Sequence, residues 1–175
     1  MSQIEHYLGN PNLKEAGVEI QFTQEQMGEY LKRAQNPIYF IEKYVKIVNL
    51  DLGLTNFDMY DFQRDIIQKV HDNRFVICKM PRQSGKSTTV ISYLLHYILF
   101  NSEMNLAILA NKQATARELL HRLQTAYEHL PFWLQQGVVS WNKGSIELEN
   151  GSRILASSTS SSAVRGGSFN LLFLD

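Results

Sequence analysis

The sequence contains a single cysteine, Cys78, among its 175 residues. A lone cysteine excludes a disulfide framework and a cysteine cluster for zinc, and it favours an intracellular protein. Seventeen basic residues balance seventeen acidic ones, so the overall charge does not indicate a nucleic-acid partner. The longest apolar-rich stretch, residues 90–100, is interrupted by Ser92 and His96 and is far shorter than the roughly 20 residues that span a bilayer. Secretion and membrane insertion are therefore not expected.

The composition is that of one folded domain. Apolar residues make up 44% of the chain and charged residues 19%, which is enough apolar surface for a core and too little charge for a disordered chain. A chain of this length accommodates one ordinary domain with a small appendage. We expect a tail and helical appendage at residues 1–56 and a main domain at residues 57–175.

The appendage shows two helix signals after a polar start. Residues 1–22 lack periodicity and predict a tail or docking arm. Thr23 and Gln26 have the spacing of a capping box, which opens a helix that ends near Gln35. A second helix is expected after Asn36-Pro37, and residues 51–56 read as a loop. The apolar positions of this second helix recur at helical spacing: Phe40, Ile41, Tyr44, Val45 and Val48.

The main domain alternates helical patterns with short apolar runs. Helices are predicted at residues 62–72, 86–100 and 112–130, and strands at residues 75–79, 106–110 and 171–174. Residues 145–149 and 152–155 alternate around Asn150-Gly151, a strong hairpin signal. The alternation predicts an α/β fold with a mainly parallel sheet flanked by helices, interrupted by this β-hairpin insertion.

A phosphate-binding loop is predicted at residues 80–87, Met-Pro-Arg-Gln-Ser-Gly-Lys-Ser. Gly85 allows a tight turn, after which backbone N–H groups and the helix N-terminus face an anion. Lys86 can reach the β and γ phosphates, and the Ser87 hydroxyl can bind Mg²⁺. Met80 replaces the usual first glycine. The expected nucleotide-binding residues of the loop are Arg82, Gln83, Ser84, Gly85, Lys86, Ser87 and Thr88.

Asp175 and Gln63 are two further candidate binding residues if residues 80–87 bind phosphate. Asp175 ends an apolar strand, where such folds place a second acidic group that holds Mg²⁺; taken alone, an aspartate there is more often a cap. The Gln63 amide offers a donor and an acceptor that match adenine, with Tyr60 or Phe62 stacking on the ring. The alternative is an ordinary helix start capped by Asp61.

Several motifs in order resemble the large terminase family, the DNA-packaging motors of tailed bacteriophages, particularly those with contractile tails. The resemblance covers roughly residues 57–175. It rests on Tyr60-Asp-Phe-Gln-Arg-Asp, Pro81-Arg-Gln-Ser-Gly-Lys-Ser, Ala107-Ile-Leu-Ala-Asn-Lys, Trp141-Asn-Lys-Gly-Ser-Ile-Glu-Leu, Ala163-Val-Arg-Gly-Gly-Ser-Phe and Leu172-Phe-Leu-Asp. This likeness implies a P-loop NTPase fold, with ATP and Mg²⁺ as ligands.

The resemblance also implies roles for single residues. Gln63 reads adenine, Arg82 senses the γ-phosphate, Lys86 holds phosphate, and Ser87 and Asp175 hold the metal ion. Arg165 is offered to the nucleotide of a neighbouring subunit. In that family a glutamate follows the strand-end aspartate and polarises the attacking water. The sequence ends at Asp175, so we expect a domain truncated after the second acidic (Walker B) strand and weak or absent hydrolysis by the isolated fragment.

The partners implied are duplex viral DNA, a portal protein, a small terminase subunit and further copies of the chain in a ring on the procapsid, in the host cell cytoplasm. Two other functions stay open. A helicase-type ATPase also carries an upstream glutamine motif, and a catalytically inactive nucleotide-binding module is compatible with the missing glutamate. The downstream sequence discriminates between them: a terminase continues to a coupling motif and a nuclease domain, a helicase to a second ATPase lobe. The five histidines show no metal-ligand spacing.

Overall fold

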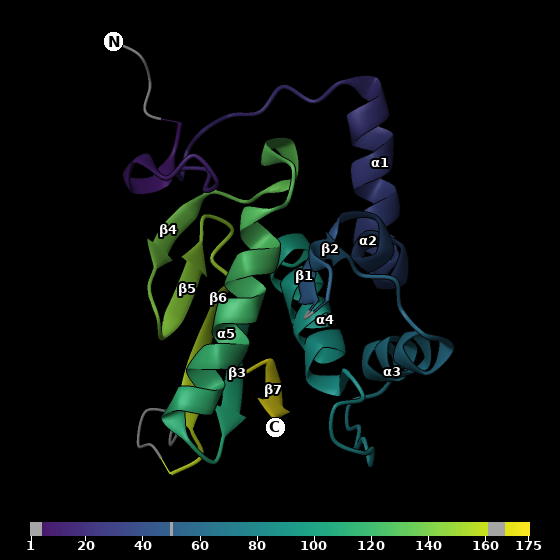
Figure 1. Ribbon diagram of the computed structural model, residues 1–175. Helices are drawn as coiled ribbons and strands as arrows, with labels where there is room; N and C mark the ends of the chain where they lie inside the picture. The colour runs from purple at the N-terminus through teal and green to yellow at the C-terminus, as the bar shows by residue number, and fades with distance from the viewer. Residues whose placement is uncertain (1–4, 50, 161–166) are drawn as a thin grey trace.

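The computed structural model describes residues 5–49, 51–160 and 167–175 (Figure 1). The α-helices are α1 (Gln24–Gln35), α2 (Pro37–Tyr44), α3 (Asp61–Asp72), α4 (Lys86–Phe100) and α5 (Gln113–Glu128). Short 3₁₀ helices occur at Tyr7–Gly9 and Phe132–Leu134. The strands are β1 (Lys46–Asn49), β2 (Gly53–Asn56), β3 (Asn105–Ala110), β4 (Val138–Trp141), β5 (Ser145–Leu148), β6 (Arg153–Ser158) and β7 (Leu171–Leu174).

The main sheet is mixed, in the order β4-β5-β6-β3-β7. Strand β3 runs parallel to both β6 and β7, whereas β5 is antiparallel to β4 and β6. The expectation of a mainly parallel sheet is therefore corrected. The predicted hairpin around Asn150-Gly151 is confirmed, with Gly151 at a φ of 77°, but its second strand is also a central strand of the sheet.

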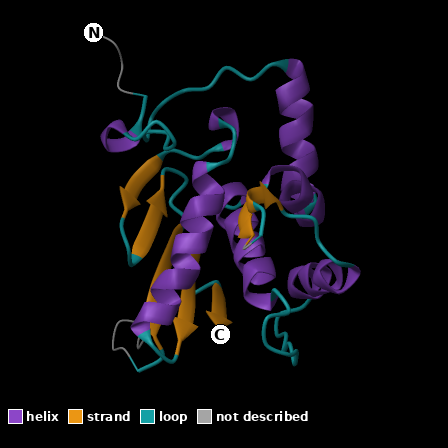
Figure 2. Ribbon diagram, in the orientation of Figure 1, coloured by secondary structure: helices purple, strands orange, loops and turns teal. Residues whose placement is uncertain are grey.

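Helices form the layers beside this sheet (Figure 2). Helix α5 packs on β3 and β6, and α4 packs between α5 on one side and α2 and α3 on the other. The apolar periodicity of α4 and α5 produces this arrangement, because each helix places a wide apolar stripe against its neighbours. Leu94, Leu95 and Ile98 of α4 are completely buried, as are Leu120 and Leu123 of α5.

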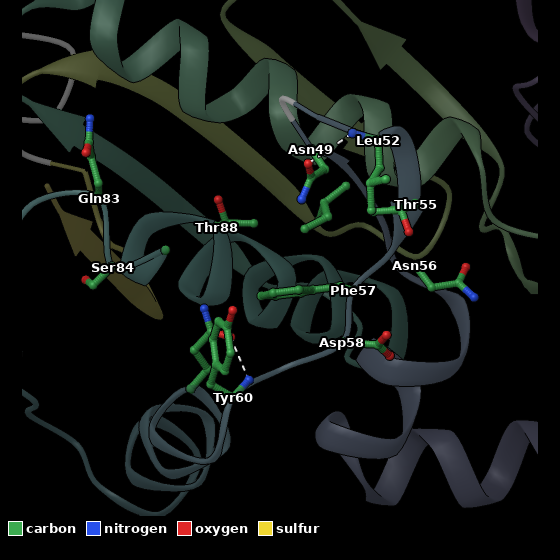
Figure 3. A pocket seen from close by; sticks show the side chains of 13 residues that line it. Asn49, Leu52, Thr55, Asn56, Phe57, Asp58, Tyr60, Gln83, Ser84 and Thr88 are labelled. Atoms are coloured by element: carbon green, nitrogen blue, oxygen red, sulfur yellow. Dashed lines mark hydrogen bonds between the residues drawn. The ribbon is translucent and has the colours of Figure 1, made fainter.

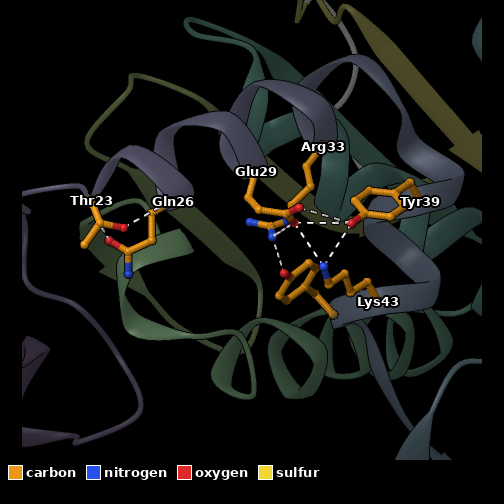
Figure 4. Close-up of polar contacts among 7 residues, drawn as sticks. Thr23, Gln26, Glu29, Arg33, Tyr39 and Lys43 are labelled. Atoms are coloured by element: carbon orange, nitrogen blue, oxygen red, sulfur yellow. Dashed lines mark hydrogen bonds and ion pairs between the residues drawn. The ribbon is translucent and has the colours of Figure 1, made fainter.

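The helices before β1 are joined by a polar network around a buried arginine (Figure 4). The Arg33 side chain is fully buried, is paired with Glu29, and lies over the rings of Tyr44 and Trp133, 3.9 and 4.8 Å from their centroids. The hydrogen bond from Lys43 lowers the pKa of Glu29 below its usual value. A buried charge needs such partners, so this network fixes α1 and α2 against the segment that follows α5.

The predicted capping box of α1 is also present. The Gln26 backbone N–H donates to Thr23 Oγ1 at 3.1 Å, and the Thr23 N–H donates to Gln26 Oε1 at 3.0 Å. The two bonds pair backbone donors that the start of a helix leaves free. The sequence therefore located the start of this helix correctly.

The polar arm before α1 docks on the outer edge of the sheet. The Val138 N–H donates to the Lys14 carbonyl at 2.8 Å. Glu149 accepts from Gly17 N at 2.9 Å and forms an ion pair with Lys14 at 2.9 Å. Partial burial acts to raise the pKa of Glu149, but the bonds from Gly17, Lys14 and Gly137 outweigh it and hold the pKa below its usual value. The segment predicted to be a tail or a docking arm is therefore a docking arm over the residues described.

Some predicted elements differ from the structure. Residues 75–79 form no strand and pair with none of the residues described; Phe75 and Ile77 are 83% and 96% exposed. The second predicted helix is shorter than expected, because α2 ends at Tyr44 and does not include Val45 or Val48. The predicted loop at residues 51–56 is instead part of an antiparallel hairpin formed by β1 and β2. None of the helices described is both long and apolar enough to cross a membrane.

Candidate functional site

The chain turns at residues 82–85, between residues 75–79 and α4. Gln83 and Gly85 have positive φ angles of 62° and 76°. A positive φ is uncommon for a residue other than glycine, and strain of this kind clusters at functional sites. Gly85 is the N-cap of α4, and its carbonyl accepts the first helical bond from Thr89 N at 3.0 Å. The first turn of α4 thus leaves backbone N–H groups available to an anion.

Gly85 has a second reason to be glycine. A Cβ atom added at this position would lie 2.6 Å from Nε2 of Gln63, which is shorter than the contacts that real Cβ atoms make. Gln63 is buried on α3, and its Oε1 accepts from Tyr60 N at 2.9 Å. This bond pairs the backbone N–H of Tyr60 at the start of α3, where the alternative interpretation placed a cap by Asp61. Gln63 therefore lies directly against the loop that the sequence places about 20 residues away.

The end of β7 meets the start of α4. The Ser87 hydroxyl donates to Asp175 Oδ1 at 2.5 Å. The Asp175 N–H donates to the Leu109 carbonyl at 2.9 Å, which continues the pairing of β7 with β3. The hydroxyl and the carboxylate are 88 residues apart in the sequence, and the fold brings their oxygens together.

Two adjoining cavities open around the loop. The first, of about 320 Å³, lies between the β1–β2 hairpin, the start of α3 and residues 83–85. Figure 3 shows Asn49, Phe57, Tyr60 and Thr88 around this space. The second, of about 550 Å³, lies between the same hairpin, residues 83–88 and α5. The cavities are neighbours along one groove, because the same six residues line both: Ile47, Asn49, Gln83, Ser84, Gly85 and Thr88.

Two cations line the second cavity. One is Lys86 at the start of α4, and the other is Arg122 on α5. Arg122 Nη1 lies 3.5 Å from Thr88 Oγ1, and its Nε donates to Glu118 at 3.3 Å. This end of the groove combines free backbone N–H groups, an ammonium and a guanidinium, which is a set of groups suited to phosphate.

The predicted site residues are distributed as follows. Gln63, Gln83, Ser84, Gly85, Lys86, Ser87 and Thr88 line the groove, and Asp175 touches it through Ser87. Arg82 is exposed and lines neither cavity. Tyr60 lines the first cavity; Phe62 stacks on Tyr60 with ring centroids 5.6 Å apart. Arg165 lies outside the residues described.

Sequence reasoning missed two parts of the groove. Arg122 lies within the helix predicted at residues 112–130, and nothing in the local sequence marks it, because its proximity to the loop arises only in the folded structure. The β1–β2 hairpin was missed although a signal was present. Ile47 and Val48 are β-branched, and the chain turns back before Gly53, which has a φ of 70°; both features favour a hairpin.

The oxygen groups at the start of α4 fit a hard cation. Mg²⁺ prefers oxygen ligands and is usually held by one or two protein groups together with waters and substrate phosphates. Ser87 Oγ and Asp175 Oδ1 provide two such oxygens beside the second cavity. Among the residues described, no cluster of three or more His, Cys, Asp or Glu side chains offers a dedicated metal cage. The donor set therefore suits a cation that arrives with a phosphate ligand.

The fold has a counterpart among solved structures. The crystal structure of the HK97 bacteriophage large terminase matches with a TM-score of 0.67 over 82% of this chain, at 21% sequence identity. The match covers 31% of the HK97 chain, so the present chain spans less than a third of that protein. An identity this low shows a common α/β fold.

The family follows from the sequence itself. Residues 77–175, more than half of the chain, match the family described as the N-terminal region of the T4-like terminase large subunit. The chain belongs to this family. The resemblance inferred from the motifs is thereby confirmed, and it relates the protein to the DNA-packaging machinery of bacteriophages.

Proposed function

We propose that the protein binds ATP with Mg²⁺ in the groove at the start of α4, as the ATPase part of a viral DNA-packaging motor with a P-loop NTPase fold. The observation that carries this proposal is the Ser87–Asp175 contact beside Gly85 and Lys86. A glycine turn, a lysine, a hydroxyl and a strand-end carboxylate are the groups that such sites use for a nucleoside triphosphate.

Each group has a separate task in this proposal. Backbone N–H groups of the first turn of α4 donate to phosphate oxygens, and Lys86 neutralises the β and γ phosphates. Ser87 and Asp175 would hold Mg²⁺, which neutralises phosphate charge when it is bound. Arg122 lines the same cavity and adds a second positive charge there.

The remaining assignments come from the terminase family. Arg82 is proposed to sense the γ-phosphate, and Arg165 to act on the nucleotide of a neighbouring subunit, where such an arginine stabilises developing charge. In the assembled motor, ATP hydrolysis drives duplex viral DNA into the procapsid. The proposed partners are the portal protein, the small terminase subunit and other copies of the chain in a ring, in the host cell cytoplasm.

The test is a titration of the protein with ATP, with and without Mg²⁺, comparing the wild type with Lys86→Ala. Loss of a charged hydrogen bond predicts an affinity about 10- to 100-fold lower. Lys79→Ala is the matched control, because Lys79 is an exposed lysine of the preceding segment and lines neither cavity. Equal ATP affinity of the wild type and Lys86→Ala contradicts the proposal.

A further inference from the structure

The β1–β2 hairpin forms the wall of the first cavity that faces the loop. Ile47 and Asn49 lie on one face of β1, and both line the first cavity and the adjoining second one. Thr55 on β2 and Phe57 just after it also line this cavity. No motif in the sequence gives the hairpin a role, yet it supplies one side of the groove beside the proposed phosphate site.

The amide of Asn49 has a fixed orientation. Its Oδ1 accepts from Asp51 N at 2.8 Å and from Leu52 N at 3.2 Å, in the turn of the hairpin. Both bonds need the oxygen, so the amide cannot flip without losing them. Nδ2 is therefore a pure donor, and none of the residues described accepts a hydrogen bond from it. Figure 3 shows Asn49 at the upper edge of the cavity, between the hairpin turn and Thr88.

Gln63 has the same property on the opposite wall. Its Oε1 is taken by Tyr60 N, so its Nε2 is also a donor, and this nitrogen lies against Gly85 at the cavity edge. The cavity thus presents two amide donors with committed oxygens. The rings of Phe57 and Tyr60 line the same cavity.

Two amide donors beside aromatic rings favour a flat heterocyclic ligand. A flat ring with acceptor nitrogens on its edge can stack on an aromatic side chain and accept from both amides. A purine base has these features, because its ring nitrogens N1, N3 and N7 are acceptors in adenine. The first cavity also adjoins the second, in which phosphate is expected.

We propose that Asn49 determines base recognition by donating from Nδ2 to a ring nitrogen of the purine whose phosphates lie on residues 84–87. This inference rests on the proposed function and adds to it a specificity residue outside the loop motif. The hairpin is then part of the nucleotide site, and the adenine contact is shared between α3 and β1 rather than made by Gln63 alone.

The experiment measures the affinity of the 175-residue chain for ATP, for its 1-deaza, 3-deaza and 7-deaza analogues, and for tripolyphosphate. Each deaza analogue removes one acceptor. We expect Asn49→Ala to bind ATP about tenfold more weakly than the wild type, the effect of one lost hydrogen bond at a desolvated site. Tripolyphosphate affinity stays unchanged. One deaza analogue binds the wild type about tenfold more weakly than ATP, and Asn49→Ala binds that analogue and ATP equally.

Leu54→Ala is the matched control, because Leu54 lies on the same hairpin and lines neither cavity. It should bind all ligands as the wild type does. If Asn49→Ala binds ATP normally, or binds it weakly while still discriminating the deaza analogue as the wild type does, the base contact is wrong although the phosphate site stands. If the wild type binds neither ATP nor tripolyphosphate, both the proposed function and this inference fail.

Discussion

The two ends of helix α4 differ sharply in their surroundings. In the first turn, Lys86, Ser87 and Thr88 are only half buried and line the groove. From Thr89 to Leu99 every side chain except that of Tyr97 is buried against α2, α3 or α5. One helix thus carries a ligand site at its start and a large part of the core along the rest. Binding and stability therefore depend on different residues of the same helix, and substitutions can separate them.

The largest effect on stability is expected from Leu94→Ala in the buried part of α4. Leu94 is fully buried, and removing such a side chain lowers the free energy of unfolding by about 2–5 kcal/mol. Urea unfolding at neutral pH measures this loss. Leu31→Ala is the control, because Leu31 on α1 is 56% exposed and its loss should change the free energy by only about 0.5 kcal/mol. Similar losses for the two variants contradict the packing described.

A pH effect of comparable size is expected from His96 in the same buried region. Burial, which outweighs the bond to the Arg33 carbonyl, lowers the pKa of His96 to about 4. A group with a lowered pKa in the folded state stabilises the protein above its unfolded pKa, here 6.5, and this stability is lost as the pH falls toward 4. The loss amounts to about 3 kcal/mol.

His96→Gln retains a donor for the Arg33 carbonyl and cannot titrate. Unfolding free energies of the two proteins at pH 7 and pH 4.5 isolate the histidine, because the carboxylates titrate in both. The wild type should lose more stability than the variant over this interval. An equal loss in the two proteins shows that His96 is not buried as a neutral group.

Gly85→Ala should act mainly on the open end of α4. The substituted Cβ meets Gln63 Nε2, and the backbone has a φ of 76°. Strain of this kind costs about 1–3 kcal/mol, and displacement of the loop should remove most of the ATP affinity. The double variant Gly85→Ala/Gln63→Ala relieves the overlap but not the strained φ. Unfolding and ATP titration measure the two effects; normal ATP affinity in Gly85→Ala shows that the loop geometry is not needed.

The smallest effect is expected far from the groove, at the capping box of α1. Thr23→Ala removes the hydroxyl that accepts from Gln26 N and should lower the free energy of unfolding by about 1 kcal/mol. ATP affinity should not change, because α1 contributes no residue to either cavity. Thr23→Ser keeps the acceptor and should restore the stability. A loss of ATP affinity in Thr23→Ala indicates coupling between the two regions.

The sequence predicted those elements whose cause is local. Helices α4 and α5 follow from apolar periodicity, the turn at Asn150-Gly151 from its residue types, and the loop around Gly85 from its motif. Residues 75–79 have the apolar character of a strand but form none, because a strand requires a pairing partner and local sequence does not show whether one is available. Val45 and Val48 fitted helical spacing by coincidence and concealed the β1–β2 hairpin.

In the candidate site too, the sequence predicted only the residues that a local pattern marks. Lys86, Ser87 and Asp175 were identified because a motif or a strand end marks them. Asn49 and Arg122 were not, since each reaches the groove only through the packing of α5 against β1 and α4. That Gln63 reads the base is a prediction from its residue type, and its close approach to Gly85 depends on the folded structure alone.

Hydrogen–deuterium exchange of the 175-residue chain, with and without MgATP, is the sharpest test of a nucleotide site at the start of α4. We expect ATP to increase amide protection at residues 83–88 and in the hairpin at residues 46–56, while protection in the buried part of α4 and in the docking arm stays unchanged. Protection confined to β4 and β5, or no change at residues 83–88 under saturating ATP, contradicts a nucleotide site at the open end of α4.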